Sequence, residues 1–184
     1  SAIYRYFPSR DDLLTALIID AYDKLGRRVE DDEGRVDRAD LTGRFMAAAH
    51  AVRDWALAHP HEYALIYGSP VPGYRAPQDT VASAIRTSLV LGRILNDGVR
   101  SGALRADPAI EVPATVAREV RNVADVISPD VPPAIASRGM GAWVHLFGMV
   151  SFELFGQFNN TIDDRASFFD YQMRTQVALI GLDS

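Results

Sequence analysis

The sequence contains no cysteine, and this absence limits the chemistry available to the chain. Without thiols there is no disulfide, no thiolate metal site and no cysteine nucleophile. Cysteine usage therefore gives no indication of the redox compartment. Because no signal peptide is visible either, we expect a cytoplasmic protein.

Basic residues are also fewer than acidic residues. There are 19 Lys and Arg residues against 24 Asp and Glu residues, which gives a formal net charge of −5. This balance argues against a chain that coats nucleic acid or anionic membrane over its whole surface, although a small local basic site remains compatible with it. A hydrophobic content of 48% and a length of 184 residues fit a globular protein with one large domain, or one domain plus a fragment of another.

The chain lacks the alternating pattern of β-strands, and its apolar residues recur at helical spacing instead. Pro8 ends a first helical segment, and Ser9 with Asp12 forms a capping box that begins the next one. The sequence therefore predicts an all-α fold. Further helices are expected from Leu41 to the break at His59-Pro60, over Glu62–Tyr67, as one long helix over 78–100, over Val112–Ile127, and as two closing helices after the linker SPDVPP.

The penultimate helix, MGAWVHLFGMVSFELFGQF, is apolar on nearly every side. A membrane span is one reading, but the segment holds His145, Glu153 and three glycines and lacks the flanking charges of an anchored helix. A helix outside the membrane that is apolar all round has to be covered on more than one face.

This helix has two stripes of apolar or small residues and the final helix has one, and each stripe can pack against another helix. We interpret the two closing helices as a dimer interface that pairs into a four-helix bundle across a two-fold axis, with a larger monomeric core as the alternative. The predicted interface residues are Trp143, Phe147, Val150, Leu154, Phe169, Met173, Val177 and Ile180. The second stripe of the penultimate helix, where small residues permit close approach, comprises Gly141, His145, Gly148, Met149, Phe152 and Gly156.

The opening segment SAIYRYFPSRDDLLTAL resembles the end of the DNA-binding module of TetR-family transcriptional regulators. The elements Y-x-Y-F, P-S-R and D-x-L-L occur in the family's order and spacing. The resemblance implies that the sequence begins inside a recognition helix. It also implies that residues 1–34 hold the end of a helix-turn-helix and the connecting helix, and that residues 35–184 form a ligand-sensing and dimerisation domain.

The same resemblance implies roles for the first residues. A recognition helix lies in the major groove with its flanks against phosphate. Tyr4 and Tyr6 would place hydroxyls on phosphate oxygens, and Arg10 would add a charge-assisted phosphate contact. The positions nearest the bases would be Ser1, Ala2 and Arg5. Taken singly, the aromatic residues also fit packing at a helix end, and Arg10 also fits a solvated cap neighbour.

A second resemblance lies far from the first. The segments HPHEYALIYGSPVPGY and WVHLFGMVSFELFG, with the spacing W-x-H-x-x-G, look like the regulatory domain of a TetR subfamily labelled by a Trp-His-Gly pattern. The resemblance implies a ligand-sensing helical dimer. Polar and aromatic residues suitable for a mostly apolar pocket are Trp55, Tyr63, Tyr67, His145, Met149 and Glu153, each of which also fits a core or interface position. Arg86, Arg93 and Arg100 recur every seven residues, which is typical of a solvated face, with an anionic effector as the alternative.

Signatures of catalysis and of metal binding are missing. His59 and His61 flank a proline and share no helical face, so we expect no metal site there. There is no nucleophile elbow, P-loop or dinucleotide fingerprint, so we expect no catalytic residue and no cofactor.

The sequence therefore predicts a regulator that binds DNA and is not an enzyme. We expect a ligand-released repressor that acts as a homodimer on a palindromic operator. Its partners would be operator DNA, an unidentified small-molecule effector and a second copy of the chain, with no membrane partner. The alternative is a helical small-molecule-binding or scaffolding dimer with no DNA role.

Overall fold

The computed structural model describes residues 7–106 and 111–183, and within these ranges the chain is all-helical, without strands. This confirms the all-α fold. The elements in chain order are α1 (Arg10–Gly34), α2 (Leu41–Ala58), α3 (Pro60–Tyr67), the 3-10 turn η2 (Gln78–Thr80), α4 (Val81–Ala84), α5 (Arg86–Ser101), α6 (Ala114–Ile127), α7 (Pro133–Leu154) and α8 (Arg165–Ile180).

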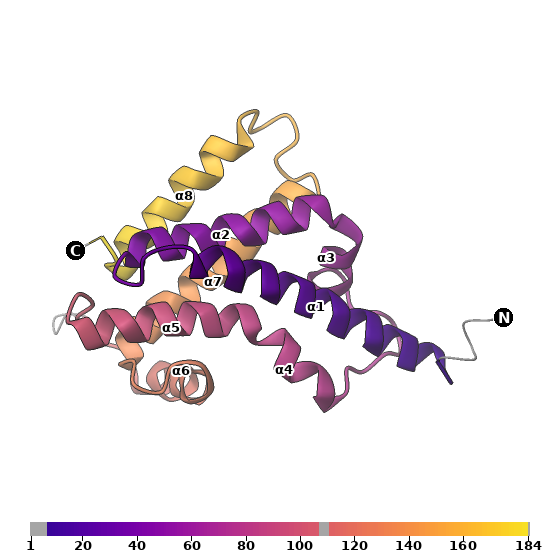
Figure 1. Ribbon diagram of the computed structural model, residues 1–184, viewed down its shortest axis with the longest axis horizontal. Helices are drawn as coiled ribbons and strands as arrows, with labels where there is room; N and C mark the ends of the chain where they lie inside the picture. Colours follow the sequence, from indigo (N-terminus) through magenta and orange to yellow (C-terminus); the bar gives the residue numbers. More distant parts are fainter. Residues whose placement is uncertain (1–6, 107–110, 184) are drawn as a thin grey trace.

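The helices pack around α7 and the adjoining parts of α1 and α2. In Figure 1, α1 and α2 run side by side across the front, α7 crosses behind them, and α8 and α6 lie on opposite sides of the molecule. The N-terminal end of α1 projects beyond the other helices (Figure 1). Fully buried side chains from different helices meet in one core, among them Leu25, Tyr63, Ile94, Val150 and Phe169.

The first helix begins where the capping box predicts. Ser9 is the N-cap, and its side-chain oxygen accepts a hydrogen bond from the Asp12 amide at 3.1 Å. Ser9 Oγ in turn donates to the Asp12 carboxylate at 2.7 Å. The first of these bonds satisfies the Asp12 amide, which has no intrahelical partner in the first turn.

The prediction of a single long helix over 78–100 is wrong for the first part of that range. The chain forms η2 and α4 first, and Ile85, with φ −85° and ψ −5°, separates α4 from α5. Val81, at the start of α4, is 39% exposed. The bend at Ile85 changes the course of the chain (Figure 1), and Arg86, the next residue, packs against α1.

The face assigned to the dimer interface needs correction. Phe147 and Val150 on α7 are buried within the chain, and so are Phe169, Met173, Val177 and Ile180 on α8. Trp143 and Leu154 pack against the same core. These eight side chains therefore form part of the core of the single chain. In the described ranges, no helix is long and apolar enough to cross a membrane.

Candidate functional site

The residues predicted to contact DNA lie almost wholly outside the described part of the chain. Ser1, Ala2, Tyr4, Arg5 and Tyr6 fall there. Arg10 is the first residue of α1, and its side chain is exposed. The projecting end of α1 also exposes an apolar side chain, Leu17, which is 46% accessible.

The aromatic residues predicted for a ligand pocket form a packed cluster instead. Trp55 is buried and stacks on the ring of His59, with the ring centroids 5.1 Å apart. The Tyr63 hydroxyl donates to the Phe147 carbonyl at 3.2 Å and lies 2.9 Å from Ser151 Oγ. Burial raises the pKa of Tyr63 to about 12 and also raises the pKa of Tyr67. Tyr63 is therefore a hydrogen-bonded core residue, and Tyr67 packs against the same core.

The other three predicted pocket residues lie on α7. The Glu153 carboxylate accepts two hydrogen bonds from the Arg53 guanidinium, from Nε and Nη2, each at 2.7 Å. Both side chains are nearly buried, so this fork joins α2 to α7. Met149 is buried, and the half-buried His145 has an Nε2 atom without a hydrogen-bond partner in the described part of the chain.

A cavity of about 150 Å³ lies between α5, α6 and α7. None of the six predicted pocket residues lines it. Its lining residues are mainly small or aliphatic: Ser88, Leu91, Gly92, Leu95, Val120, Val123, Ala124, Ile127, Ser128, Ala136, Gly139, Met140 and Trp143. The apolar lining is that of a small-molecule site rather than of a polar active site.

Trp143, Ser88 and Ser128 are the residues with polar side chains in the wall of this cavity. The indole Nε1 of Trp143 is buried and has no hydrogen-bond partner among the described residues. Trp143 and Leu91 also line a second, smaller cavity of about 30 Å³, on the side of Phe45 and Val52. Buried N–H groups nearly always have a partner, so the Trp143 indole N–H is an exception in the described part of the chain.

Arg86 ties α5 to α1. Its Nε and Nη2 donate to the two carboxylate oxygens of Glu30 at 3.0 and 2.5 Å, and its Nη1 donates to Asp23 Oδ1 at 3.0 Å. Hydrogen bonds to Glu30, and then to Asp23, raise the pKa of Arg86. The side chain lies against Gly26, between the two acids along α1, where a Cβ atom would collide with it.

Sequence reasoning missed this role because Arg86, Arg93 and Arg100 follow one seven-residue repeat. Arg93 is exposed, and Arg100 forms an exposed ion pair with Asp130 at 2.7 Å. Only Arg86 of the three reaches α1. The acids at positions 23 and 30 with a glycine between them, on one face of α1, were the available signal.

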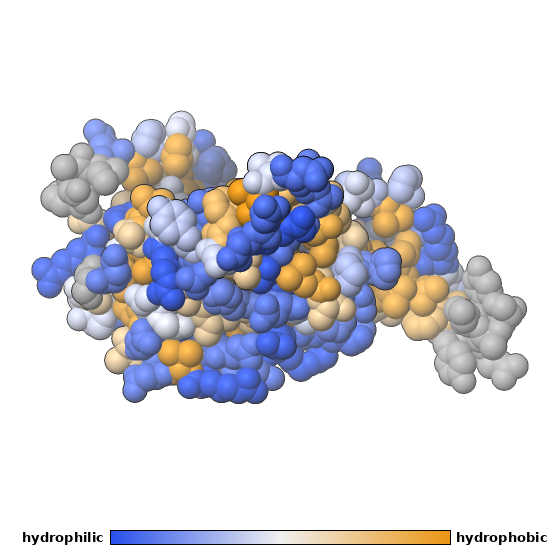
Figure 2. Space-filling model, turned by 90° about the horizontal axis from the view of Figure 1, so that it is seen from above, coloured by the Kyte–Doolittle hydropathy of each residue, from blue (hydrophilic) through white to orange (hydrophobic). Residues whose placement is uncertain are grey.

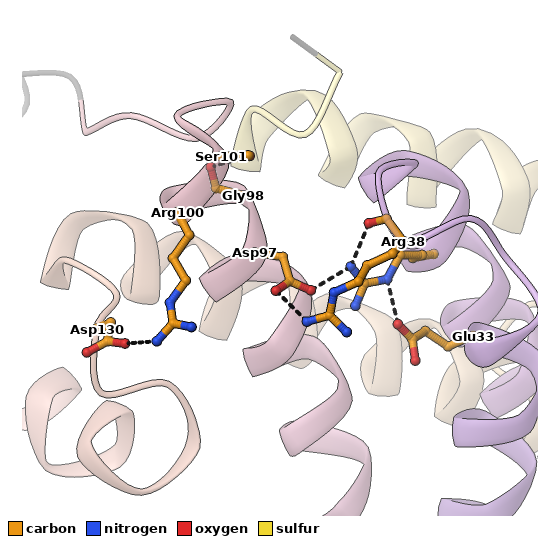
Figure 3. Close-up of polar contacts among 8 residues, drawn as sticks. Glu33, Arg38, Asp97, Gly98, Arg100, Ser101 and Asp130 are labelled. Atoms are coloured by element: carbon orange, nitrogen blue, oxygen red, sulfur yellow. Dashed lines mark hydrogen bonds and ion pairs between the residues drawn. The ribbon is translucent and has the colours of Figure 1, made fainter.

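A second ionic cluster fixes the C-terminal end of α1 (Figure 3). The buried Arg44 guanidinium on α2 pairs with Glu33 of α1 at 2.6 Å and with Asp97 of α5 at 2.8 Å. It also donates to the Arg38 carbonyl at 3.0 Å, while the Arg38 side chain pairs with Asp97 at 2.8 Å. Burial favours the neutral acid, but hydrogen bonds from Arg44 and Arg38 outweigh it and lower the pKa of Asp97.

The outward faces of α7 and α8 carry apolar side chains. Val144 and Phe152 on α7 and Tyr171 and Leu179 on α8 are between 54% (Phe152) and 67% (Tyr171) exposed. Gly148, on the same face of α7 as Val144 and Phe152, has open space where a Cβ would stand. Figure 2, which shows the molecule from the α8 side, has hydrophobic patches between hydrophilic ones on its surface.

Both the sequence and the fold of the chain are similar to those of known proteins. Residues 45–176 match the tetracyclin repressor-like C-terminal domain family. HTH-type transcriptional regulator Rv1816 of Mycobacterium tuberculosis and its counterpart Mb1846 of Mycobacterium bovis are each 32% identical over 183 residues, which is 98% of this chain and 78% of theirs.

The solved structures agree in fold. A crystal structure designated as that of a regulatory protein, SCO4313, superposes with a TM-score of 0.74 and 32% identity over 96% of this chain and 78% of that one. A protein of unknown function from Rhodococcus has a TM-score of 0.65 at 19% identity, over 95% of this chain and 73% of its own. The second match shows the fold alone.

Proposed function

The chain belongs to the TetR family of DNA-binding transcriptional regulators, and we propose that it acts as a ligand-released repressor, a homodimer on a palindromic operator. The observation that carries the proposal is the position of α5. One face of this helix lines the apolar cavity, while Arg86 at its N-terminal end is bound to α1, which we take to be the connecting helix. A ligand that moves α5 therefore acts on α1 through a direct ionic contact.

The DNA-binding part of the proposal rests on the opening residues and on the shape of α1. We propose that residues 1–34 comprise the end of the helix-turn-helix and the connecting helix, and that 35–184 sense ligand and dimerise. The predicted contacts of the first residues with phosphates and bases remain predictions. The projecting end of α1 and exposed Leu17 support a neighbouring domain there. A DNA partner agrees with the cytoplasmic location that we expect.

The dimer is proposed on the outward face of α7 and α8. Four large apolar side chains are exposed there, and Gly148 leaves room for a helix of the second copy. A two-fold interface uses the same surface on both subunits, so these exposed side chains of one copy would face those of the other. It would hold the two DNA-binding heads at the spacing of successive major grooves.

The test combines oligomeric state with DNA binding. Val144→Arg places two like charges near a two-fold axis and is expected to produce monomers in sedimentation velocity and to weaken operator binding more than about tenfold. Val126→Arg, on α6, is the matched control because Val126 is equally exposed, at 63% against 61%. A Val144→Arg protein that remains dimeric would contradict the proposed interface.

A further inference from the structure

We propose that Tyr74 is a positioning residue for DNA binding, because its hydroxyl holds the projecting end of α1 in the orientation that binds the operator. Tyr74 lies in residues 68–77, the non-helical segment GSPVPGYRAP between α3 and η2, which we call the strap. The inference rests on the proposed function, in which α1 connects the DNA-binding head to the rest of the chain. It deepens that function by naming a contact outside α1 that fixes the direction of this helix.

The strap is a stiff segment that is anchored at both ends. Its three prolines fix their own φ angles and so limit the conformations of the backbone. At one end, the Gly68 amide donates to the Ala64 carbonyl of α3 at 2.9 Å. At the other end, the Pro77 carbonyl accepts hydrogen bonds from the amide and the hydroxyl of Thr80, at 3.1 and 2.8 Å. The strap therefore follows a defined course beside α1 (Figure 1).

A tight turn within the strap presents Tyr74 to α1. The Tyr74 amide donates to the Val71 carbonyl at 3.1 Å, and Gly73 has a φ of +78°. A proline at the second position of a four-residue turn and a glycine with positive φ at the third position are typical of a type II β-turn. Pro72 and Gly73 occupy these two positions. The last residue of the turn, Tyr74, is half-buried and reaches Thr15 of α1.

The hydroxyl of Tyr74 donates a hydrogen bond to α1. It lies 2.9 Å from Oγ1 of Thr15, which is in the second turn of this helix. A threonine hydroxyl has one proton, and Thr15 Oγ1 donates it to the Asp11 carbonyl at 2.8 Å. Thr15 Oγ1 therefore accepts from Tyr74, and a phenylalanine at position 74 would lose this bond while it keeps the ring.

This bond anchors α1 close to its projecting end. In the described part of the chain, Thr15 is the first residue of α1 whose side chain hydrogen-bonds another element. The next is Tyr22, whose hydroxyl donates to the Ile66 carbonyl of α3 at 3.3 Å. At about 1.5 Å per residue, loss of the Tyr74 bond lengthens the end of α1 beyond its first hydrogen-bonded anchor from about 8 Å to about 18 Å. A given tilt at the anchor then moves the tip more than twice as far.

A less constrained α1 weakens DNA binding without unfolding the chain. The two heads of a dimer must reach successive major grooves together, so a wider range of α1 orientations has to be given up when they bind. The lost contact is one neutral hydrogen bond, which is worth about fivefold in an equilibrium constant. We therefore expect Tyr74→Phe to bind operator about fivefold more weakly than the wild type.

Hydrogen exchange and operator binding of the full-length protein test the proposal. In Tyr74→Phe, amide exchange in the first two turns of α1 should be about fivefold faster, and fluorescence anisotropy should show the fivefold loss of operator affinity. Thr15→Val should cause the same two changes, whereas Thr15→Ser, which keeps the hydroxyl, should cause neither. The double variant should be no worse than either single variant, because both remove the same bond. Additive losses in the double variant would overturn the proposal.

Thr42→Val is the matched control. Thr42 Oγ1 also donates a partly buried hydrogen bond of 2.9 Å, but its acceptor is the Leu182 carbonyl and it lies at the start of α2. Its loss should leave both the operator affinity and the exchange in the first two turns of α1 unchanged. An equal fall in operator affinity in Thr42→Val and Tyr74→Phe would mean that lost stability is the cause, and would refute the positioning role.

The two readouts also separate this inference from the proposed function. Hydrogen exchange needs no DNA, so unchanged exchange in Tyr74→Phe would by itself disprove that the strap anchors α1. Faster exchange with wild-type or tighter operator binding would exclude the positioning role and leave the repressor assignment intact. Failure of the wild-type protein to bind operator contradicts the proposed function instead.

Discussion

Replacing Arg86 with methionine removes the charge that joins α5 to α1 and keeps most of the side-chain length. The aliphatic part of Arg86 lies over Gly26, so a methionine can maintain that contact. What is lost is the fork onto Glu30 and the hydrogen bonds to the carboxylate and the backbone carbonyl of Asp23. The perturbation therefore tests the ionic contact rather than packing.

The expected magnitude follows from the exposure of the groups. The Arg86 side chain is 23% exposed, and each of the two acids is 32% exposed. Fully exposed pairs contribute about 0.2–1 kcal/mol, whereas removal of one partner of a fully buried pair costs about 3–5 kcal/mol. For this intermediate case we expect Arg86→Met to lower the free energy of unfolding by about 2 kcal/mol.

Urea denaturation followed by circular dichroism measures this change. Arg93→Met is the control, because Arg93 is exposed on the same helix, and it should change stability by less than about 0.5 kcal/mol. In a double-mutant cycle, Glu30→Gln should cost much less in the Arg86→Met background than in the wild type. Equal stability of the two methionine variants, or additive costs in the cycle, would refute the claim that Arg86 binds α5 to α1.

Three further predictions concern the ends of α1 and the cluster around Arg44. Arg44→Met leaves the buried Glu33 carboxylate without its partner and should lower the unfolding free energy in urea by about 3 kcal/mol. Adding Glu33→Gln should restore part of that stability, and no restoration would contradict the pairing. The pKa of Asp97 is lowered in the folded state, so its contribution to stability is present above about pH 4 and is lost as the pH falls through the lowered value. Asp97→Asn should therefore flatten the pH dependence of the unfolding free energy below about pH 4. An unchanged slope would argue against this role of Asp97. Ser9→Ala removes the N-cap of α1 and should speed amide hydrogen exchange in its first turn about fivefold, whereas Ser101→Ala should leave that turn unchanged.

Local signals in the sequence were sufficient for much of the fold. The Ser9 capping box correctly predicted the start of α1, because that bond forms between residues three apart. The interruption at Ile85 was missed, because the apolar period continues through residues 81–99 while tertiary contacts of Arg86 with α1 decide the bend. The interface face was misassigned because both stripes of α7 are apolar, so the sequence contains no polar face to mark the exterior.

The candidate site was less accessible to sequence reasoning. Large aromatic and polar residues such as Tyr63 and Glu153 attract attention, yet their hydrogen bonds are used within the core. The cavity instead borders glycines and alanines from three helices, which are unremarkable one by one and form a site only when the helices pack. Trp143 was noticed for its motif and its stripe, but its unpaired indole N–H appears only in three dimensions.

Binding of the full-length gene product to DNA tests the central claim most directly. Fluorescence anisotropy of a labelled duplex from the region flanking its own gene, compared with a scrambled duplex at several salt concentrations, measures both affinity and selectivity. If the chain is a TetR-family repressor, it should bind the flanking duplex at least about a thousandfold more tightly than the scrambled one. Its affinity should also fall steeply with salt, because phosphate contacts release counterions. No binding to flanking DNA even at low salt would contradict the account.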